Sequence, residues 1–306
     1  MTASENAPFG ALAPGPLDRL VLALTGRLPD NWLGLRLAMV LRRAVTRRLA
    51  YPDGALDVER WGIRLRLHPR DNGCEKNLLF TPQMYEPTEL RELAADIARV
   101  KAQARPFVFV DIGANVGLFS LFVAACAGRD ARILAIEPEP GNLLRLEFNV
   151  HANRNAPIKI LPIALSDEAG DMTIELDRRD RGGTRTKKAS TVNAGSSVAR
   201  VPAQTLLGVL SSERVQAIDA LKIDVEGFED VILCPFFRDA PRWLWPRLIV
   251  IEDSRRDWRM DLMPALAAKG YSISTRSKQN VVLRLAKNQI VSAVPRRPAQ
   301  MDARPG

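Results

Sequence analysis

The chain has 306 residues, of which 46% are hydrophobic and 26% are charged, and its formal net charge is +9. This length and apolar content suit one large α/β domain with extensions. The chain has two histidines, which excludes a histidine-rich metal site. Its three cysteines form no C-x-x-C pair, which indicates reduced thiols in a cytoplasmic protein.

The N-terminal part is rich in small residues and then in arginine. Residues 1–16 are predicted to be disordered, and residues 17–54 to form a basic helical extension. Within it, residues 17–50 hold seven arginines against Asp18 and Asp30. The simpler interpretation is a helical pair packed on the following domain with a solvated basic side. The alternative is a basic amphipathic segment that rests on an anionic membrane surface. Because such helices could equally serve a dimer interface, no oligomeric state is predicted.

Neither a signal peptide nor a membrane span is expected. No stretch reaches the roughly 18 apolar residues that a bilayer requires, and the N-terminus has no basic region before an apolar run. We therefore predict a cytoplasmic protein, with peripheral contact at the inner face of the membrane as the alternative.

Residues 55–105 are predicted to form a strand and helix cap. Two short strands, Leu56–Arg60 and Ile63–His68, are joined by a turn at Gly62, and the helix Thr88–Val100 follows after a loop.

The segment Phe107–Ser120 is the most informative part of the chain. Its first half is an apolar, β-branched strand, as a buried parallel strand requires, and this strand ends at Asp111. A glycine-containing turn then leads into a helix over 117–127. Glycines allow a ligand to approach the backbone, and a helix N-terminus presents unpaired N–H groups. The segment therefore predicts a crevice for a nucleotide-like cofactor.

Two acids indicate which cofactor this crevice takes. The turn reads Asp111-x-Gly113-x-x-x-Gly117 with Asn115 inside it, and so differs from the G-x-G-x-x-G fingerprint that binds a pyrophosphate. An acid here would repel pyrophosphate but attract an amine or a sulfonium, and S-adenosylmethionine (SAM) carries both. A second apolar strand ends in Glu137, where a ribose diol would donate two hydrogen bonds. The pattern favours SAM over NAD and over a plain structural turn.

Alternating strands and helices continue beyond this point. Strands are expected over 107–111, 132–137, 158–163, 219–224 and 247–252, with a final hairpin over 271–275 and 280–285. Helices are expected near 117–127, 141–153, 227–237 and 260–269, and an inserted antiparallel pair over 171–177 and 197–202. This order predicts an α/β, Rossmann-like, doubly wound and mostly parallel sheet over residues 106–285, with an antiparallel C-terminal hairpin strand. Residues 286–306 are predicted to be a disordered tail.

The strand over 219–224 carries the most specific motif, Leu221-Lys-Ile-Asp-Val-Glu-Gly-Phe-Glu229. It resembles the Lys-Ile-Asp-Val-Glu-Gly signature of the FkbM-family SAM-dependent methyltransferases. The resemblance covers roughly residues 55–285, and its other parts are Tyr85-Glu86-Pro87, Asp111-Ile-Gly-Ala-Asn-Val-Gly117, Ile136-Glu-Pro138, Asn149 and Ile251-Glu252. One departure is Thr205-Leu206-Leu207, where family members usually carry Thr-Leu-Asp.

The resemblance implies O-methylation by a class I methyltransferase, with a sugar hydroxyl of a cell-surface or secreted glycan as the favoured acceptor. Methylation of a polyketide or lipid hydroxyl is one alternative. Another is a SAM-binding module without turnover in a membrane glycan-assembly complex, which the missing Thr-Leu-Asp acid would allow. No nucleic-acid partner is expected, because no recognition motif accompanies the basic charge.

The predicted cofactor residues gather at the carboxyl ends of the strands. Asp111 is assigned to the methionine amine, directly or through water, and Glu137 to the ribose hydroxyls. The residues assigned to close backbone approach are Gly113, Ala114, Asn115 and Gly117. Ser166 and Asp167 are candidates for the adenine edge. The resemblance places Glu86 near the cofactor, where it would close over the methionine end.

The predicted catalytic residues are Asp224, Glu226 and Lys222. An alcohol needs a base close to its oxygen, and the two carboxylates are assigned to that role, with the lysine holding one of them or the substrate. The alternative is a structural ion pair between Lys222 and Asp224. A divalent ion held by these carboxylates and Glu252 would suit an oxygen ligand set, but the spacing does not require it and no metal is predicted.

Overall fold

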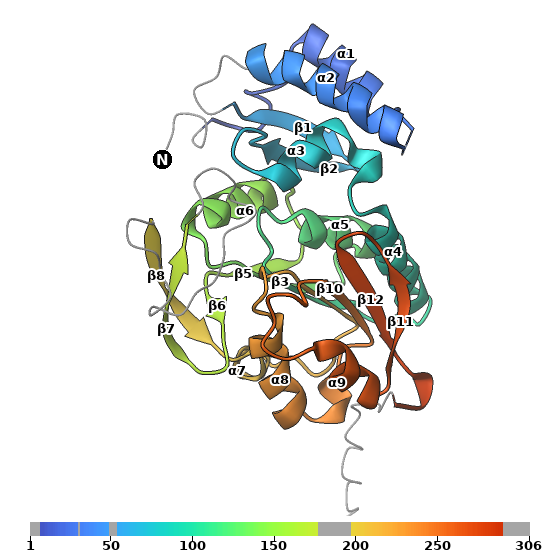
Figure 1. Ribbon diagram of the computed structural model, residues 1–306, viewed down its shortest axis with the longest axis vertical. Helices are drawn as coiled ribbons and strands as arrows, with labels where there is room; N and C mark the ends of the chain where they lie inside the picture. The colour runs from blue at the N-terminus through green and yellow to red at the C-terminus, as the bar shows by residue number, and fades with distance from the viewer. Residues whose placement is uncertain (1–6, 30, 49–53, 177–196, 290–306) are drawn as a thin grey trace, which may run out of the picture.

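The computed structural model describes residues 7–29, 31–48, 54–176 and 197–289 (Figure 1). At its centre is a seven-stranded sheet with the order β11-β12-β10-β9-β3-β4-β5. The parallel strands are β3 (Val108–Ile112), β4 (Arg132–Ile136), β5 (Ile158–Leu161), β9 (Ala220–Ile223) and β10 (Leu248–Glu252). The antiparallel strands at one edge are β11 (Tyr271–Arg276) and β12 (Asn280–Leu285). This topology confirms the predicted Rossmann-like, doubly wound fold.

The order of strands in the sheet reverses direction along the chain between β3 and β9. After β3 the chain adds β4 and then β5 on one side, whereas β9 and β10 lie on the other side of β3. In open α/β sheets, ligands bind beyond the carboxyl ends of the strands at such a reversal. The topology therefore directs attention to the ends of β3 and β9.

Helices cover both faces of the sheet (Figure 1). They are α4 (Pro87–Lys101), α5 (Leu118–Ala127), α6 (Pro140–Ala152), α7 (Leu206–Ser212), α8 (Glu229–Asp239) and α9 (Leu262–Ala268), with short 3-10 turns at Pro82–Met84, Arg242–Leu244 and Lys287–Gln289. Alternate strand residues enter two hydrophobic cores. In β10, Ile249 and Ile251 join one core, while Leu248 and Val250 join the other. Burial on both faces explains the nearly continuous apolar strands.

A small three-stranded sheet interrupts the path from β5 to β9. It contains β6 (Ala164–Leu165), β7 (Gly170–Glu175) and β8 (Val198–Gln204), in the order β6-β8-β7. The antiparallel β7–β8 pair confirms the predicted insertion. Helix α7, which the sequence analysis did not predict, begins at Thr205, whose hydroxyl accepts a hydrogen bond from the Gly208 N–H.

The N-terminal part forms a cap at one end of the molecule (Figure 1). Its elements are α1 (Pro16–Thr25), α2 (Trp32–Arg48), β1 (Leu56–Arg60), β2 (Ile63–Leu67) and α3 (Gly73–Phe80). Helix α3 replaces part of the predicted loop. It begins where the Asn72 side chain accepts a hydrogen bond from the Glu75 N–H, and its three consecutive buried residues Leu78, Leu79 and Phe80 give no helical period in the sequence.

Part of the predicted disordered N-terminus is ordered. The buried carboxylate of Asp57 accepts hydrogen bonds from the Gly10 and Leu12 N–H groups. The Arg66 guanidinium, itself paired with Asp57, donates to the carbonyl oxygens of Ala7 and Pro8. Residues 1–6 and 290–306, which include most of the predicted tail, lie outside the described residues. Within the described part, no helix has the length and the apolar content that a membrane span requires.

Packing fixes the glycine turn that follows β3. Gly113 has a φ of 74°, and a Cβ built on it would lie 1.9 Å from the backbone oxygen of Asp224. Gly117 has a φ of 87°, and its Cβ would lie 2.5 Å from the Leu146 side chain. At both positions, the atoms that leave no room for a side chain belong to the protein itself and not to a ligand. The glycines therefore let β9 and α6 approach the turn, whereas the sequence analysis assigned them to ligand approach.

Gly113→Ala is expected to lower the free energy of unfolding by more than about 3 kcal/mol, because the clashing atom is the backbone of the neighbouring strand end and cannot rotate away. Gly62→Ala is the matched control. Gly62 has a φ of 75° and nothing within 4 Å of a built Cβ, so this variant should lose only the left-handed strain of about 1–2 kcal/mol. Urea unfolding followed by circular dichroism measures both variants, and equal losses would contradict the proposed clash.

Candidate functional site

A pocket opens at the carboxyl ends of the parallel strands, where the strand order reverses. Its lining includes five carboxylates, those of Glu86, Glu137, Asp224, Glu226 and Glu252. Within the described part of the chain, no lysine or arginine lines it. The lining is therefore rich in acidic groups, which favours a positively charged ligand.

A single buried ammonium group lies behind this acidic wall. Lys222 is 4% exposed, and its Nζ donates a hydrogen bond of 3.0 Å to Asp224 Oδ2. The same Nζ lies 4.9 Å from the centre of the Phe119 ring. Burial by itself would lower the pKa of this ammonium, but three carboxylates raise that pKa above its ordinary value. They belong to Asp224, Asp111 and Glu86.

Asp111 lies within the protein and does not line the pocket. Its side chain is 1% exposed, and Oδ2 accepts a hydrogen bond of 2.6 Å from the Ser120 hydroxyl. The other oxygen, Oδ1, has no hydrogen-bond partner among the described residues. Burial raises the pKa of this carboxyl, while Lys222 opposes that rise. Asp111 therefore lies behind the pocket wall, directly beside Lys222 on the neighbouring strand.

Glu137 organises the turn after β3 from the end of β4. Its Oε2 accepts a 2.7 Å hydrogen bond from the Asn115 N–H, and its Oε1 accepts a 2.9 Å bond from the Glu139 N–H. The preceding N–H groups of Gly113 and Ala114 both donate to the carbonyl oxygen at the end of β4. Burial raises the pKa of Glu137 to about 7. Each carboxylate oxygen keeps a second lone pair, so the group could also accept two hydrogen bonds from a diol.

Glu86 lies just before α4 and contacts the C-terminal hairpin (β11 and β12) at the pocket. It precedes α4 with a φ of 43°, a left-handed conformation that is unusual for a residue with a side chain. Its carboxylate accepts a 3.3 Å hydrogen bond from the Asn280 side chain at the start of β12. Burial raises the pKa of Glu86 to about 8, and Lys222 opposes this rise. The segment that contains Glu86 thus forms part of the pocket wall.

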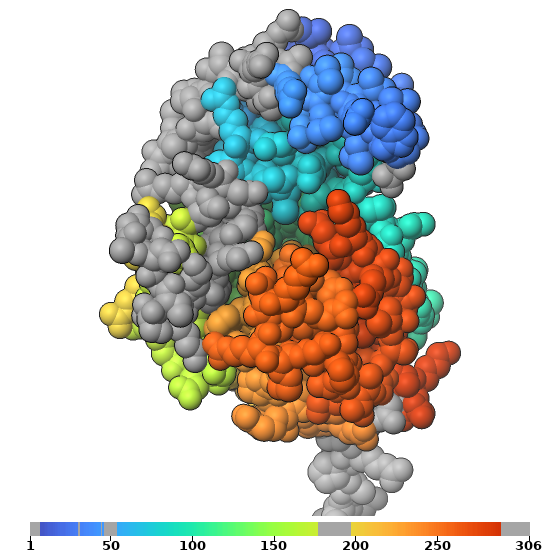
Figure 2. Space-filling view, in the orientation of Figure 1, coloured from blue at the N-terminus to red at the C-terminus, as the bar shows by residue number. Residues whose placement is uncertain are grey.

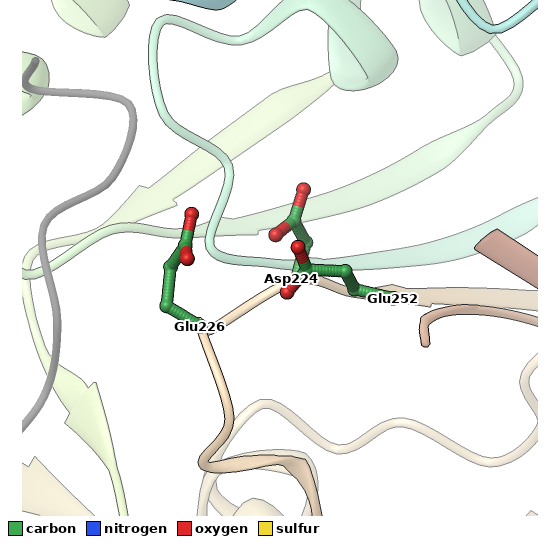
Figure 3. A group of neighbouring side chains, drawn as sticks. All are labelled: Asp224, Glu226 and Glu252. Atoms are coloured by element: carbon green, nitrogen blue, oxygen red, sulfur yellow. The ribbon is translucent and has the colours of Figure 1, made fainter. Parts of the chain in front are cut away.

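Three of the lining carboxylates converge on one point (Figure 3). Asp224, Glu226 and Glu252 each offer an oxygen, and these oxygens lie within 4.8 Å of one another. Burial and the nearby Asp224 raise the pKa of Glu252 to about 7, while the Ser254 hydroxyl donates to it at 2.7 Å. Such a cluster can share a proton or hold a cation. It is the place where a divalent ion would bind if the protein used one, and the absence of a metal remains a prediction.

The structure brings together only part of the predicted cofactor set. Gly113 and Asn115 line the pocket, as does Glu86. Ala114 and Gly117 lie behind the lining, and Ser166 and Asp167 pair with each other through a 2.9 Å hydrogen bond after β6. The lining residues that sequence reasoning did not assign are Cys74, Pro138, Asn142, Ile174, Val225, Gln279 and Asn280. Pro138 and Val225 adjoin predicted residues, whereas the hairpin residues reach the pocket only through the tertiary fold.

The chain is similar to a family model and to a curated protein. Residues 111–273 match the family model described as the methyltransferase FkbM domain. A segment of 67 residues is 45% identical to the AMB antimetabolite synthetase AmbE of Pseudomonas aeruginosa. That segment is 22% of this chain, and it spans only 3% of the length of that curated relative.

Two solved structures are similar to the chain over most of its length. The human methyltransferase 10 domain containing protein is 13% identical, with a TM-score of 0.44, over 85% of this chain and 99% of that chain. A methyltransferase from Geobacter sulfurreducens is 15% identical, with a TM-score of 0.38, over 88% of this chain and 96% of that chain.

The free energy of unfolding is expected to fall as the pH rises from about 5 to 8. In the folded protein the pKa values of Glu86, Glu137 and Glu252 are about 8, 7 and 7, against an ordinary value of 4.5. The folded state therefore binds more protons than the unfolded chain in this window, and ionisation of the three groups disfavours it.

Urea unfolding at a series of pH values measures this slope. Glu252→Gln should make the slope shallower, because one raised carboxyl is removed, whereas the exposed Glu168→Gln should leave it unchanged. A stability that rises over this range, or the same slope in Glu252→Gln as in the wild type, would contradict the assignment.

Proposed function

The chain belongs to the FkbM methyltransferase family, and from this premise we propose that it transfers a methyl group from SAM to a hydroxyl group. The favoured acceptor is a sugar of a cell-surface or secreted glycan, the acceptor class that the family resemblance implies. The observation that carries the proposal is the charge of the pocket, which five carboxylates line without a lysine or arginine from the described residues.

The described residues fit SAM better than a cofactor with a pyrophosphate. When bound, SAM supplies an activated methyl group on a positively charged sulfonium, and it also carries an amine. Five carboxylates favour these positive charges and would repel a pyrophosphate. Glu137 would accept the ribose hydroxyls, and the unpartnered Oδ1 of Asp111 would accept a hydrogen bond from a water shared with the amine.

The pocket also contains suitable bases for the acceptor. Asp224 is held by the Lys222 ammonium at 3.0 Å, and Glu226 projects from a left-handed backbone position with a φ of 55°. With SAM bound, the acceptor oxygen would take the methyl group as the methyl–sulfur bond breaks and S-adenosylhomocysteine leaves. One of these two carboxylates would then accept the proton of the hydroxyl group. The pairing of Lys222 with Asp224 is then both structural and functional, because the ammonium fixes the direction of the carboxylate.

The wall formed by the C-terminal hairpin supports a polar acceptor. Gln279 and Asn280 line the pocket on the same side as Glu252. Amide and carboxylate groups suit a molecule with several hydroxyls, because their remaining donor and acceptor positions can be paired, whereas an apolar polyketide or lipid would leave those positions unpaired. This polar wall favours the sugar hydroxyl over the two apolar alternatives.

A SAM-binding module without turnover is the second candidate, and one observation favours it. Leu207 stands where family members usually carry the acid of Thr-Leu-Asp, and it packs against the hydrophobic core. Any task of that acid is therefore missing here. The retained carboxylates Asp224 and Glu226 in the pocket favour the enzyme.

A transfer assay with labelled SAM and a panel of glycan and small-molecule hydroxyls separates the two candidates. Asp224→Asn should lower kcat by about 10²–10⁴, because general base catalysis contributes that much, while binding of S-adenosylhomocysteine should change little. Asp253→Asn is the matched control, since Asp253 follows the pocket residue Glu252 but pairs with Arg255. Cofactor binding without transfer to any acceptor would support the non-catalytic module, and full activity in Asp224→Asn would exclude that residue as the base.

A further inference from the structure

The N-terminal hairpin, defined here as α1 and α2, exposes an unusual amount of apolar surface. Of the fifteen large hydrophobic residues that are exposed in the described chain, nine lie between residues 17 and 40. Among them, Leu20 is 56% exposed, Trp32 is 68% exposed and Val40 is 65% exposed. The hairpin lies at the end of the molecule, beyond β1, β2 and α3 (Figures 1 and 2). Exposed apolar residues on an ordinary surface are scattered singly, whereas these are concentrated in one hairpin.

The packing of α2 explains the exposure. The residues of α2 that are buried against the rest of the cap include Gly34, Ala38 and Val45, which are small and share one helical face. Six large apolar side chains of α2 are exposed, whereas Leu41, on the buried face, is half-buried. A helix that served only to cover the cap would bury its large apolar residues and expose its polar ones. This helix buries small residues and exposes its large apolar ones together with Arg36, so its outer face needs a partner.

The charge of the hairpin indicates the chemistry of that partner. Arg19, Arg27 and Arg36 are exposed, whereas Asp18 is the only acidic residue among the described residues of the two helices. The Arg36 guanidinium lies 5.3 Å from the centre of the Trp32 ring on the outer face. Arginines interspersed with tryptophan and aliphatic residues fit the boundary between lipid headgroups and acyl chains. A second copy of the same face would oppose arginine with arginine.

A groove beside α1 adds a place for a phosphate group. It lies between α1 and β1, and its lining includes Arg19, Arg27 and Arg60. The Arg60 Nε is buried and has no hydrogen-bond partner within the described part of the chain. Asp57 and Glu59 also line the groove, but their carboxylates are already paired with Arg66 and Arg64, respectively. The groove therefore offers guanidinium donors to an anion at the edge of the apolar face.

We propose that the N-terminal hairpin docks on an anionic lipid bilayer surface. The apolar side chains of α1 and α2 enter the headgroup boundary, the arginines contact lipid phosphates, and the groove takes one headgroup. This inference does not depend on the methyltransferase activity, because it rests on the cap alone. It would hold the enzyme at the surface where lipid-linked acceptors reside.

Co-sedimentation of the full-length protein with vesicles tests the proposal without cofactor or acceptor. Vesicles with about 40% phosphatidylglycerol should bind the protein at least about tenfold more tightly than pure phosphatidylcholine vesicles. Raising the salt from roughly 50 to 500 mM NaCl should weaken the binding, because the arginine contacts are screened. Equal binding to both vesicles, or no binding to either, would overturn the proposal.

Two double variants and two matched controls locate the surface. Trp32→Ser/Val40→Ser and Arg19→Ala/Arg36→Ala should each reduce vesicle binding by about tenfold. The controls Trp243→Ser/Ile273→Ser and Arg129→Ala/Arg154→Ala alter exposed residues elsewhere and should bind as the wild type does. Thermal unfolding verifies that all four variants fold. Variants that bind vesicles as tightly as their controls would overturn the proposal. So would a wild-type dimer, detected by sedimentation velocity, that the Trp32→Ser/Val40→Ser substitutions dissociate.

Discussion

The candidate site depends on one buried ammonium group. Lys222 lies on β9 directly beside Asp111 on β3, and its charge acts on carboxylates from the ends of two strands and from the start of α4. Without it, these acids would be close together in a poorly solvated region with no compensating charge, which is strongly unfavourable. The lysine thus allows an acidic site to form at the reversal of the strand order.

The charge of Lys222 does not neutralise all the carboxylates around the pocket. One ammonium faces five lining carboxylates, and the pKa values of Glu86, Glu137 and Glu252 are raised to between about 7 and 8. Such groups hold protons that a cationic ligand would displace, so ligand binding and ionisation are coupled. The pocket is therefore least favourable when empty and ionised, and a cation relieves that repulsion. The same charge that costs folding stability selects the ligand.

Local sequence patterns predicted most of the fold but only part of the site. Apolar runs that end in Asp111 and Glu137 located two strands, because parallel strands are buried on both faces. The order of the strands, and with it the reversal, came from the structure. Helix α3 was missed since its buried residues are consecutive, and Asn280 was missed since it reaches Glu86 across 194 positions of the chain. The glycines show a subtler limit. The sequence shows where the glycines are. The atoms that require them, at the end of β9 and in α6, are identified only by the packed structure.

Calorimetric titration with S-adenosylhomocysteine, SAM and NAD tests the central claim most directly, namely that an acidic pocket built around Lys222 selects a SAM-type cofactor. The account predicts binding of SAM and S-adenosylhomocysteine in the micromolar range, no binding of NAD, and an affinity at least about tenfold weaker in Asp111→Ala. Binding of NAD, no binding of either SAM-type ligand, or an affinity unaffected by Asp111→Ala would contradict it.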